Sequence, residues 1–184
     1  MDRERVEQGI KMMMDGLGLD RQREGLRDTP QRVAAMFIDD FFAHIDEDPG
    51  DVLDTFFHSD YDEMVALRGI PFHSVCEHHL LPFIGTASIV YIPKGGLVVG
   101  ASKLARAVEI AASRPQLQER MTSQLADILM EKLTPHGVLV RLEAEHLCMT
   151  LRGIKKPGSR LVTTAIRGLF RTDPAARNEA LRMV

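Results

Sequence analysis

The strongest constraint on the fold is a strand pattern that ends in two residue types able to bind metal. From Val138 to Thr150, apolar side chains alternate with polar ones, as they do along a half-buried β-strand. The residues that share the apolar face are Val138, Val140, Leu142, Ala144, His146 and Cys148. A histidine and a cysteine two residues apart on such a face are unusual for packing alone. The pattern predicts a strand over 138–150 that carries a metal ligand beside an acid–base group.

The chain has 2 cysteines and 7 histidines, and the other cysteine also lies among histidines, in Cys76-Glu77-His78-His79. Thiolate and imidazole are ligands that zinc takes in proteins. Cys76 and His79 are three residues apart, so a turn can bring both to one ion, and Cys148 would be the third ligand. A single buried cysteine is usually a small hydrophobe. Two cysteines that each have a histidine within three residues favour one metal site split across the chain.

The spacing leaves two kinds of zinc site open. A structural site has four protein ligands, whereas a catalytic site has three and keeps one position open. His78 or His146 could complete a structural site. A catalytic site would instead leave both histidines for proton transfer.

The rest of the pattern predicts an α+β fold after residue 63. Strand, strand, helix, helix, strand and strand are expected over residues 64–73, 85–93, 102–113, 116–133, 138–150 and 161–170. This order is typical of an antiparallel sheet with helices on one face. A four-stranded sheet has two open edges, and pairing between subunits into a closed barrel would remove them.

The remaining segments are expected to be helical extensions. Residues 1–63 should form an N-terminal helical region, with helices over 3–17 and 28–45, followed by an acidic loop. Residues 64–172 form the main domain, and residues 173–184 a C-terminal helix that starts at Asp173-Pro174. The N-terminal segment has no apolar stretch of a signal peptide, no apolar run reaches the roughly 20 residues of a membrane helix, and a cytoplasmic location is expected.

The charge distribution predicts an anionic partner. Residues 1–63 hold 17 acidic and 7 basic side chains, whereas residues 64–184 hold 9 acidic and 16 basic ones. A basic half fits a phosphorylated metabolite, nucleic acid or the acidic half of a neighbouring subunit. Aromatic residues do not alternate with the cations of the basic stretch after His146, so a surface that stacks RNA bases is not expected.

The segment from Gly96 to Arg106 predicts a helix start that binds an anion. Free backbone N–H groups at a helix start attract phosphate, and Ser102 could cap the helix or donate to a ligand. Lys103 and Arg106 lie on one face at i, i+3 spacing. Arg152, four residues after Cys148, adds a further cation.

The first turn of the next helix carries Gln118 and Glu119. An amide beside a carboxylate could read a guanine edge, whose N1–H and N2–H₂ groups are donors. An acidic residue favoured by the helix dipole is an equally good explanation from this segment alone.

Four motifs together resemble the GTP cyclohydrolase I family. They are Cys76-Glu77-His78-His79, Ser102-Lys103-Leu104-Ala105-Arg106, Arg114-Pro115-Gln116-Leu117-Gln118-Glu119-Arg120, and Glu145-His146-Leu147-Cys148-Met149 followed by Arg152-Gly153. The resemblance runs from Asp28-Thr29-Pro30-Gln31-Arg32-Val33 to Arg177-Asn178-Glu179, with the motifs in the family's order. It implies the tunnelling fold, one Zn2+ ion per subunit, and a homodecamer of two face-to-face pentameric rings with active sites at subunit interfaces.

The resemblance also implies a reaction and a role for each matching residue. The substrates are GTP and water, and the products are formate and 7,8-dihydroneopterin triphosphate, in the first step of tetrahydrofolate biosynthesis. The implied zinc ligands are Cys76, His79 and Cys148. The implied catalytic residues are His78 and His146, as an acid–base pair, and Ser102, near the ribose. The implied substrate-binding residues are Gln118 and Glu119 on the guanine, and Arg32, Lys103, Arg106 and Arg152 on the triphosphate or ribose side.

Under this hypothesis a zinc-bound hydroxide attacks guanine C8 while His146 protonates N7, and hydrolysis of the resulting formamide releases formate. Two alternatives stay open: a related zinc enzyme that stops at a formamide or cyclic phosphate, and a non-catalytic, zinc-stapled oligomer that binds nucleotide. Cys and His ligands accept other divalent ions too. Glu77 has no assigned role, and either a hydrogen bond close to the metal ligands or an ion pair between subunits would explain it.

Overall fold

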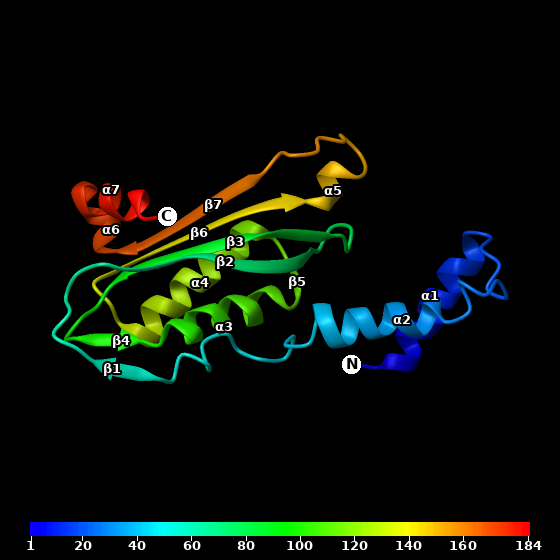
Figure 1. The fold of residues 1–184 in the computed structure, drawn as a ribbon, viewed down its shortest axis with the longest axis horizontal. Helices are drawn as coiled ribbons and strands as arrows, with labels where there is room; N and C mark the ends of the chain where they lie inside the picture. Colours follow the sequence, from blue (N-terminus) through cyan, green and yellow to red (C-terminus); the bar gives the residue numbers. More distant parts are fainter. The chain divides into compact units, whose positions relative to one another are not determined.

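The computed structural model describes residues 1–184 and divides into two units, Met1–Ile45 and Asp46–Val184. The first unit contains α1 (Arg3–Gly16), α2 (Thr29–Ala35) and a π-helix, η1 (Met36–Phe41) (Figure 1). The Asp2 carboxylate caps α1 by accepting from the backbone N–H of Arg5. These helices coincide with most of residues 3–17 and 28–45, over which the sequence predicts two helices. The division into residues 1–63, 64–172 and 173–184 stays a prediction.

The second unit is built on a five-stranded sheet in the order β5-β2-β3-β6-β7. Its strands are β2 (Val65–Cys76), β3 (Pro82–Ile92), β5 (Pro115–Gln116), β6 (Gly137–His146) and β7 (Leu161–Gly168). β5 runs parallel to β2, and the other neighbours are antiparallel. The two helices between the hairpins are α3 (Ala101–Ala112) and α4 (Gln118–Leu133). The predicted α+β class and the strand, strand, helix, helix, strand, strand order are confirmed.

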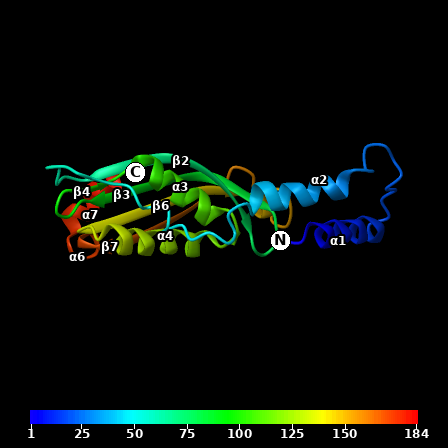
Figure 2. The same ribbon diagram turned by 90° about the horizontal axis from the view of Figure 1, so that it is seen from below.

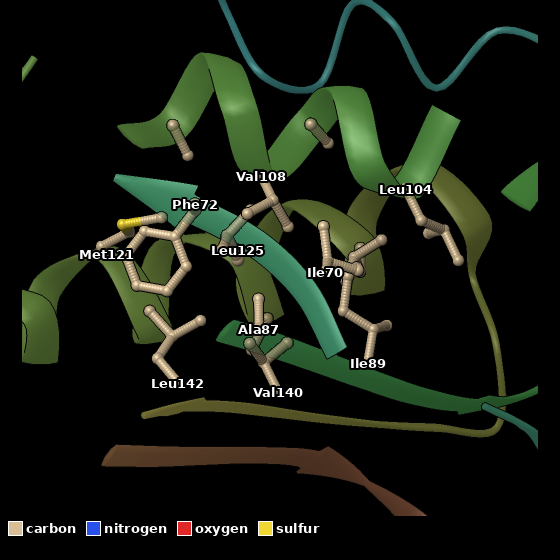
Figure 3. Packing of buried hydrophobic residues seen from close by; sticks show 14 of the residues in the cluster. Ile70, Phe72, Ala87, Ile89, Leu104, Val108, Met121, Leu125, Val140 and Leu142 are labelled. Carbon is tan, nitrogen blue, oxygen red and sulfur yellow. The ribbon is translucent and has the colours of Figure 1, made fainter. Parts of the chain in front are cut away.

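Helices α3 and α4 run along one face of the sheet (Figures 1 and 2). Figure 3 shows the core between them, where Phe72, Ala87 and Leu142 of the sheet face Val108 of α3 and Leu125 of α4. The side chains of β6 alternate between buried and half-buried from Val140 to His146, as the sequence predicts. This alternation gives the sheet one apolar face for the helices to cover.

The C-terminal helices α6 (Leu169–Thr172) and α7 (Pro174–Arg182) cover one end of the opposite face. There Val90, Leu139, Phe170 and Ala180 form a second buried cluster. The expectation of helices on one face only is therefore wrong at this end. The physical reason is that Val90 follows the inward Ile89, and Leu139 lies between the inward Val138 and Val140, so both faces are apolar there.

The list of predicted elements lacks three short strands. β1 (Phe56–His58), in the stretch that was expected to be an acidic loop, pairs with β4 (Leu97–Val99), and β5 is only two residues long. The predicted strand over 138–150 ends at His146, and α5 (Leu147–Thr150) carries Cys148. The prediction that His146 and Cys148 share a strand face is thus wrong.

The end of β6 has a physical cause in its neighbour. His146 pairs with Phe83, and the preceding residue of β3 is Pro82, which has no backbone N–H to continue the ladder. No helix of the protein combines the length and apolar character that crossing a membrane requires.

Tyr91 ties the end of β3 to β4. Its side chain is almost fully buried, and its hydroxyl accepts a hydrogen bond from the backbone N–H of Val99 at 3.2 Å. Burial raises the pKa of the Tyr91 phenol above its usual 10.0, and the bond from Val99 opposes this shift. A pKa raised on folding stabilises the folded state below the unfolded pKa, and this contribution is lost as pH rises through the folded pKa.

Replacing Tyr91 with Phe should lower the free energy of unfolding by about 1–3 kcal/mol, because the buried Val99 N–H loses its acceptor. The wild-type free energy of unfolding should also fall more steeply than that of Tyr91→Phe above the usual phenol pKa of 10.0. Urea unfolding below and above that pH measures both effects. The control is Tyr61→Phe, since Tyr61 is 47% exposed. Equal pH dependence in Tyr91→Phe and wild type would contradict the prediction.

Candidate metal centre

The chain turns sharply where β2 ends at Cys76. The backbone N–H of Cys76 donates to Leu81 O, and that of Leu80 donates to Cys76 O, both at 2.9 Å. Leu80 has φ of +52°, in the left-handed region that residues with side chains seldom adopt. This tight turn leaves Glu77, His78 and His79 exposed while Cys76 stays buried.

The two cysteines meet beside this turn, although 72 residues separate them in the chain. Their Sγ atoms lie 4.0 Å apart, and both thiols are free. Two thiolates on one tetrahedral zinc, each at about 2.3 Å from the ion, would lie about 3.8 Å apart. One ligand atom from each of Cys76, Cys148 and His146 lies within 4.8 Å of the other two. The donor set and the sulfur separation both fit a zinc ion.

The two neighbouring histidines of the turn have different contacts. His78 Nδ1 lies 3.9 Å from Cys76 Sγ. His79 Nε2 lies 3.1 Å from Arg152 Nη1, and because a guanidinium can only donate, this ring nitrogen accepts. The structure thus groups His146 with the sulfur pair and holds His79, a predicted zinc ligand, on Arg152.

His146 lies in a pocket that disfavours its charged form. Its ring stacks on Phe83 with centroids 4.5 Å apart, and its Nε2 lies 2.8 Å from Gln118 Oε1. Burial lowers the pKa of His146 below its usual 6.5, while the nearby Glu119 carboxylate raises it. The neutral imidazole is therefore the favoured state of the side chain in the folded chain.

Gln118 determines which nitrogen of His146 carries the hydrogen. Its amide nitrogen faces three acceptors, at 3.0 to 3.2 Å: Leu142 O, Leu161 O and Thr163 Oγ1. Its Oε1 therefore faces His146 and can only accept, so that Nε2 of His146 carries the hydrogen and Nδ1 keeps the lone pair. Gln118 is 1% exposed. The side chain that is predicted to hold guanine thus makes its contacts in the folded chain with His146 and with backbone carbonyl groups of β6 and β7.

The side chain of Glu119 is exposed, whereas that of its neighbour Gln118 is buried. Glu119 lines a cavity of about 540 Å³ between α4 and β7, together with Thr122, Thr163 and Arg171. The structure thus places the predicted guanine-binding carboxylate at an open cavity and within electrostatic range of His146.

The surroundings of Cys148 disfavour the ionised form of its thiol. Burial raises the pKa of the Cys148 thiol above its usual 9.0, and the neighbouring Cys76 raises it further. Arg152 lowers it only slightly by comparison. Metal binding would reverse this balance, because a coordinating thiol is deprotonated by the ion.

The predicted phosphate-binding residues lie elsewhere in the chain. Ser102 is exposed at the start of α3, and Lys103 Nζ pairs with Asp54 Oδ1 at 2.8 Å. The backbone of the preceding strand contacts Tyr91, whereas Cys76 lies beside Pro82 at the other end of β3. Nine residues of extended strand span about 30 Å. In one chain, the start of α3 and the cysteine pair thus lie at opposite ends of the sheet (Figure 1).

Two further predicted residues make local ion pairs. Arg106 lies 3.4 Å from Glu109 on the same helix. Arg32 lies 3.2 Å from Asp28 within the first unit. Asp54 and Phe83 were not among the predicted site residues, and their partners, Lys103 and His146, are fixed by tertiary packing. The acidic stretch before residue 64 is the one sequence signal that points to Asp54.

Comparisons with known proteins agree on one family. The family model described as GTP cyclohydrolase I matches residues 6–184. A GTP cyclohydrolase 1 of Carboxydothermus hydrogenoformans is 53% identical over 100% of this chain and 95% of its own length. Those of Halalkalibacterium halodurans and Bacillus subtilis are 54% and 51% identical, over 100% of this chain and 97% and 96% of their own lengths.

Replacing Gln118 with Leu should lower the free energy of unfolding by about 1–3 kcal/mol, because buried acceptors and the His146 N–H lose their partner. The Nε2-bound hydrogen of His146 should also exchange faster with solvent, which NMR of the histidine side chains detects. Gln124→Leu, a half-buried glutamine of the same helix, is the control. If the His146 proton keeps its wild-type exchange rate in Gln118→Leu, then Gln118 does not hold this ring.

Proposed function

Because this chain belongs to the GTP cyclohydrolase I family, we propose that it converts GTP and water to formate and 7,8-dihydroneopterin triphosphate. The observation that carries the proposal is the cluster of Cys76, Cys148 and His146. Its Cys and His donors suit zinc, which when bound supplies Lewis-acid chemistry and activates water near neutral pH. The remaining steps can be argued from side chains of the chain itself.

We assign the zinc to Cys76, Cys148 and His79, and leave His146 for proton transfer. The Nε2 lone pair of His79, in the turn three residues after Cys76, accepts from the exposed Arg152 and would exchange this partner for the ion. His146 is held by Phe83 and Gln118 without any ion. A ring that is positioned by the protein alone suits a proton-transfer group, whose geometry must not depend on ligation.

The tautomer of His146 supports a specific proton route. Its Nε2–H is held on Gln118 Oε1, so that Nδ1 is the atom that can take up and release a proton. We propose that Nδ1 takes up the proton that the attacking water loses and passes it to guanine N7 as the water oxygen bonds to C8. His78, beside Cys76 and exposed to solvent, would carry protons in the later ring-opening and ring-closing steps.

Glu119 would recognise the guanine. The N1–H and N2–H₂ groups of guanine donate, and an ionised carboxylate only accepts. The cavity beside Glu119 offers room for a base, and the effect of Glu119 on the His146 pKa supports binding both groups to one ligand. Gln118 would act on the base through His146.

The triphosphate would lie on residues from a second copy of the chain. Ser102 and Lys103 lie at the start of α3, at the opposite end of the sheet from the cysteine pair of the same chain. We therefore propose that the active site is shared between subunits, in the homodecamer that the resemblance implies. The open edge of β7 is a surface that subunit pairing would cover. Arg152 and Arg32 complete the proposed set of cations.

Incubating the purified protein with GTP tests the proposal. Formate and a fluorescent pterin triphosphate should appear in equal amounts, and the activity should be lost on zinc removal and recovered on zinc addition. Accumulation of a formamide or cyclic phosphate would instead indicate an enzyme that stops early. Nucleotide binding without any formate would indicate a non-catalytic scaffold.

The ligand assignment predicts different effects for the replacement of His79 and of His146. His79→Ala should lose most of its zinc, whereas His146→Ala should keep its zinc and lose about 100- to 10,000-fold in kcat, the usual worth of a general acid–base group. Metal analysis of the purified variants and the formate assay measure the two effects. His136→Ala, at an exposed position, is the control. Zinc loss in His146→Ala with retention in His79→Ala would reverse the assignment.

A shared active site predicts complementation between inactive variants. Cys148→Ser and Lys103→Ala should each have little activity, because one lacks the metal and the other a triphosphate contact. After co-refolding in equal amounts, about a quarter of the sites should contain neither substitution, since assembly is random. Activity that stays at the level of the separate variants would show that one chain supplies both residues to a site.

A further inference from the structure

Glu77 has a partner within its own chain. Its Oε2 forms an ion pair with Arg120 Nη2, although the two residues lie 43 positions apart. Glu77 follows the metal-site residue Cys76, and its backbone N–H donates to Gln116 O at 3.2 Å. This side chain and backbone therefore bind the same short segment, β5 and the first turn of α4.

Arg120 is held by more than one acceptor. Its Nε donates to Gln116 Oε1 at 3.2 Å, and its Nη2 also donates to Pro115 O at 3.3 Å. Gln116 is itself fixed, because it is 2% exposed and its amide nitrogen donates to Ala111 O at 2.8 Å. The planar guanidinium can satisfy these acceptors and a carboxylate at once, which a lysine ammonium at this position could not do.

The first turn of α4 contacts the metal centre through two side chains. Arg120 binds Glu77 in the turn that follows Cys76, and Gln118 binds His146 at 2.8 Å. Between them, Glu119 faces the cavity. The position of the Cys76 turn relative to this helix thus fixes how the metal ligands stand with respect to both the acid–base group and the base-reading carboxylate.

We propose that Glu77 and Arg120 are positioning residues that clamp the Cys76–His79 turn to the start of α4 and thereby retain the metal ion. The proposal rests on the proposed function only in taking this turn as part of the metal site. It explains why the residue between two ligand-bearing positions is a carboxylate, since that carboxylate holds the turn without touching the ion.

Because the Glu77–Arg120 pair is exposed, its effect on metal retention can be distinguished from an effect on global stability. The side chains of Arg120 and Glu77 are 51% and 34% exposed. Ion pairs this exposed add little to global stability, because water and salt screen them. Residues that orient metal ligands nevertheless change metal affinity by about 10- to 100-fold when they are replaced. Loss of the clamp should therefore appear in metal retention and leave the melting temperature almost unchanged.

The test measures zinc release from the intact protein to a chromogenic chelator. Glu77→Ala and Arg120→Ala should each release zinc about tenfold faster than wild type. Arg120→Lys should behave like Arg120→Ala, because it cannot bond to Glu77 and Gln116 together. The matched control is Glu143→Gln, since Glu143 is also 34% exposed and paired with an arginine, Arg141. It should release zinc at the wild-type rate.

The double variant Glu77→Ala/Arg120→Ala decides whether the two residues act as a unit. Its release rate should equal that of either single variant, because one substitution already opens the clamp. Multiplied effects, or single variants that retain zinc as wild type does, would overturn the proposal and leave the proposed function intact. If the wild-type protein bound no zinc, the proposed metal centre would be wrong, and the proposed clamp would be wrong with it.

Discussion

The register of three neighbouring strands is the constraint on which the metal centre depends. Val75 of β2 pairs with Pro82 of β3, and the next residue, Phe83, pairs with His146 of β6. β2 and β6 therefore end at the same level of the sheet, on either side of the residue that cannot donate to the ladder. The chain leaves the sheet at Cys76 and just before Cys148, and the two thiols meet there. A shift of one residue in the pairing of β3 with β6 would turn His146 to the other face.

Some of this centre could be predicted from the sequence. Alternation on β6 placed His146 on the buried face, and the pairing of each cysteine with a histidine predicted a metal site. Two of its predicted ligands, Cys76 and Cys148, group with His146 within 4.8 Å, whereas the predicted ligand His79 is not in this group. The place where β6 ends could not be predicted from β6, since it is determined by Pro82 on another strand. The orientation of the Gln118 side chain could not be predicted either, because the groups that accept its hydrogen bonds belong to β6 and β7. Short-range patterns do not encode such long-range contacts.

A buried histidine ring needs a hydrogen-bond partner in place of water, and in this fold the side-chain amide of Gln118 is that partner. An unpaired polar group in such a place costs about 1–3 kcal/mol. Gln118 satisfies the ring N–H of His146 and also the carbonyl oxygens of two strands, so that one side chain serves both stability and orientation. The same burial lowers the pKa of His146 and keeps it neutral until a charge change nearby favours protonation.

The separation of the basic helix start from the cysteine pair has an electrostatic consequence. Lys103 is desolvated to about one-third exposure and is neutralised within its own chain by Asp54, whose pKa the lysine lowers. A triphosphate bound there would bring a far larger negative charge than one carboxylate, and would draw the ammonium toward itself. Asp54 therefore keeps this cation ordered when no phosphate is bound. Such an arrangement suits a phosphate-binding lysine, because a lysine without a fixed partner would lose more rotamer freedom when an anion binds.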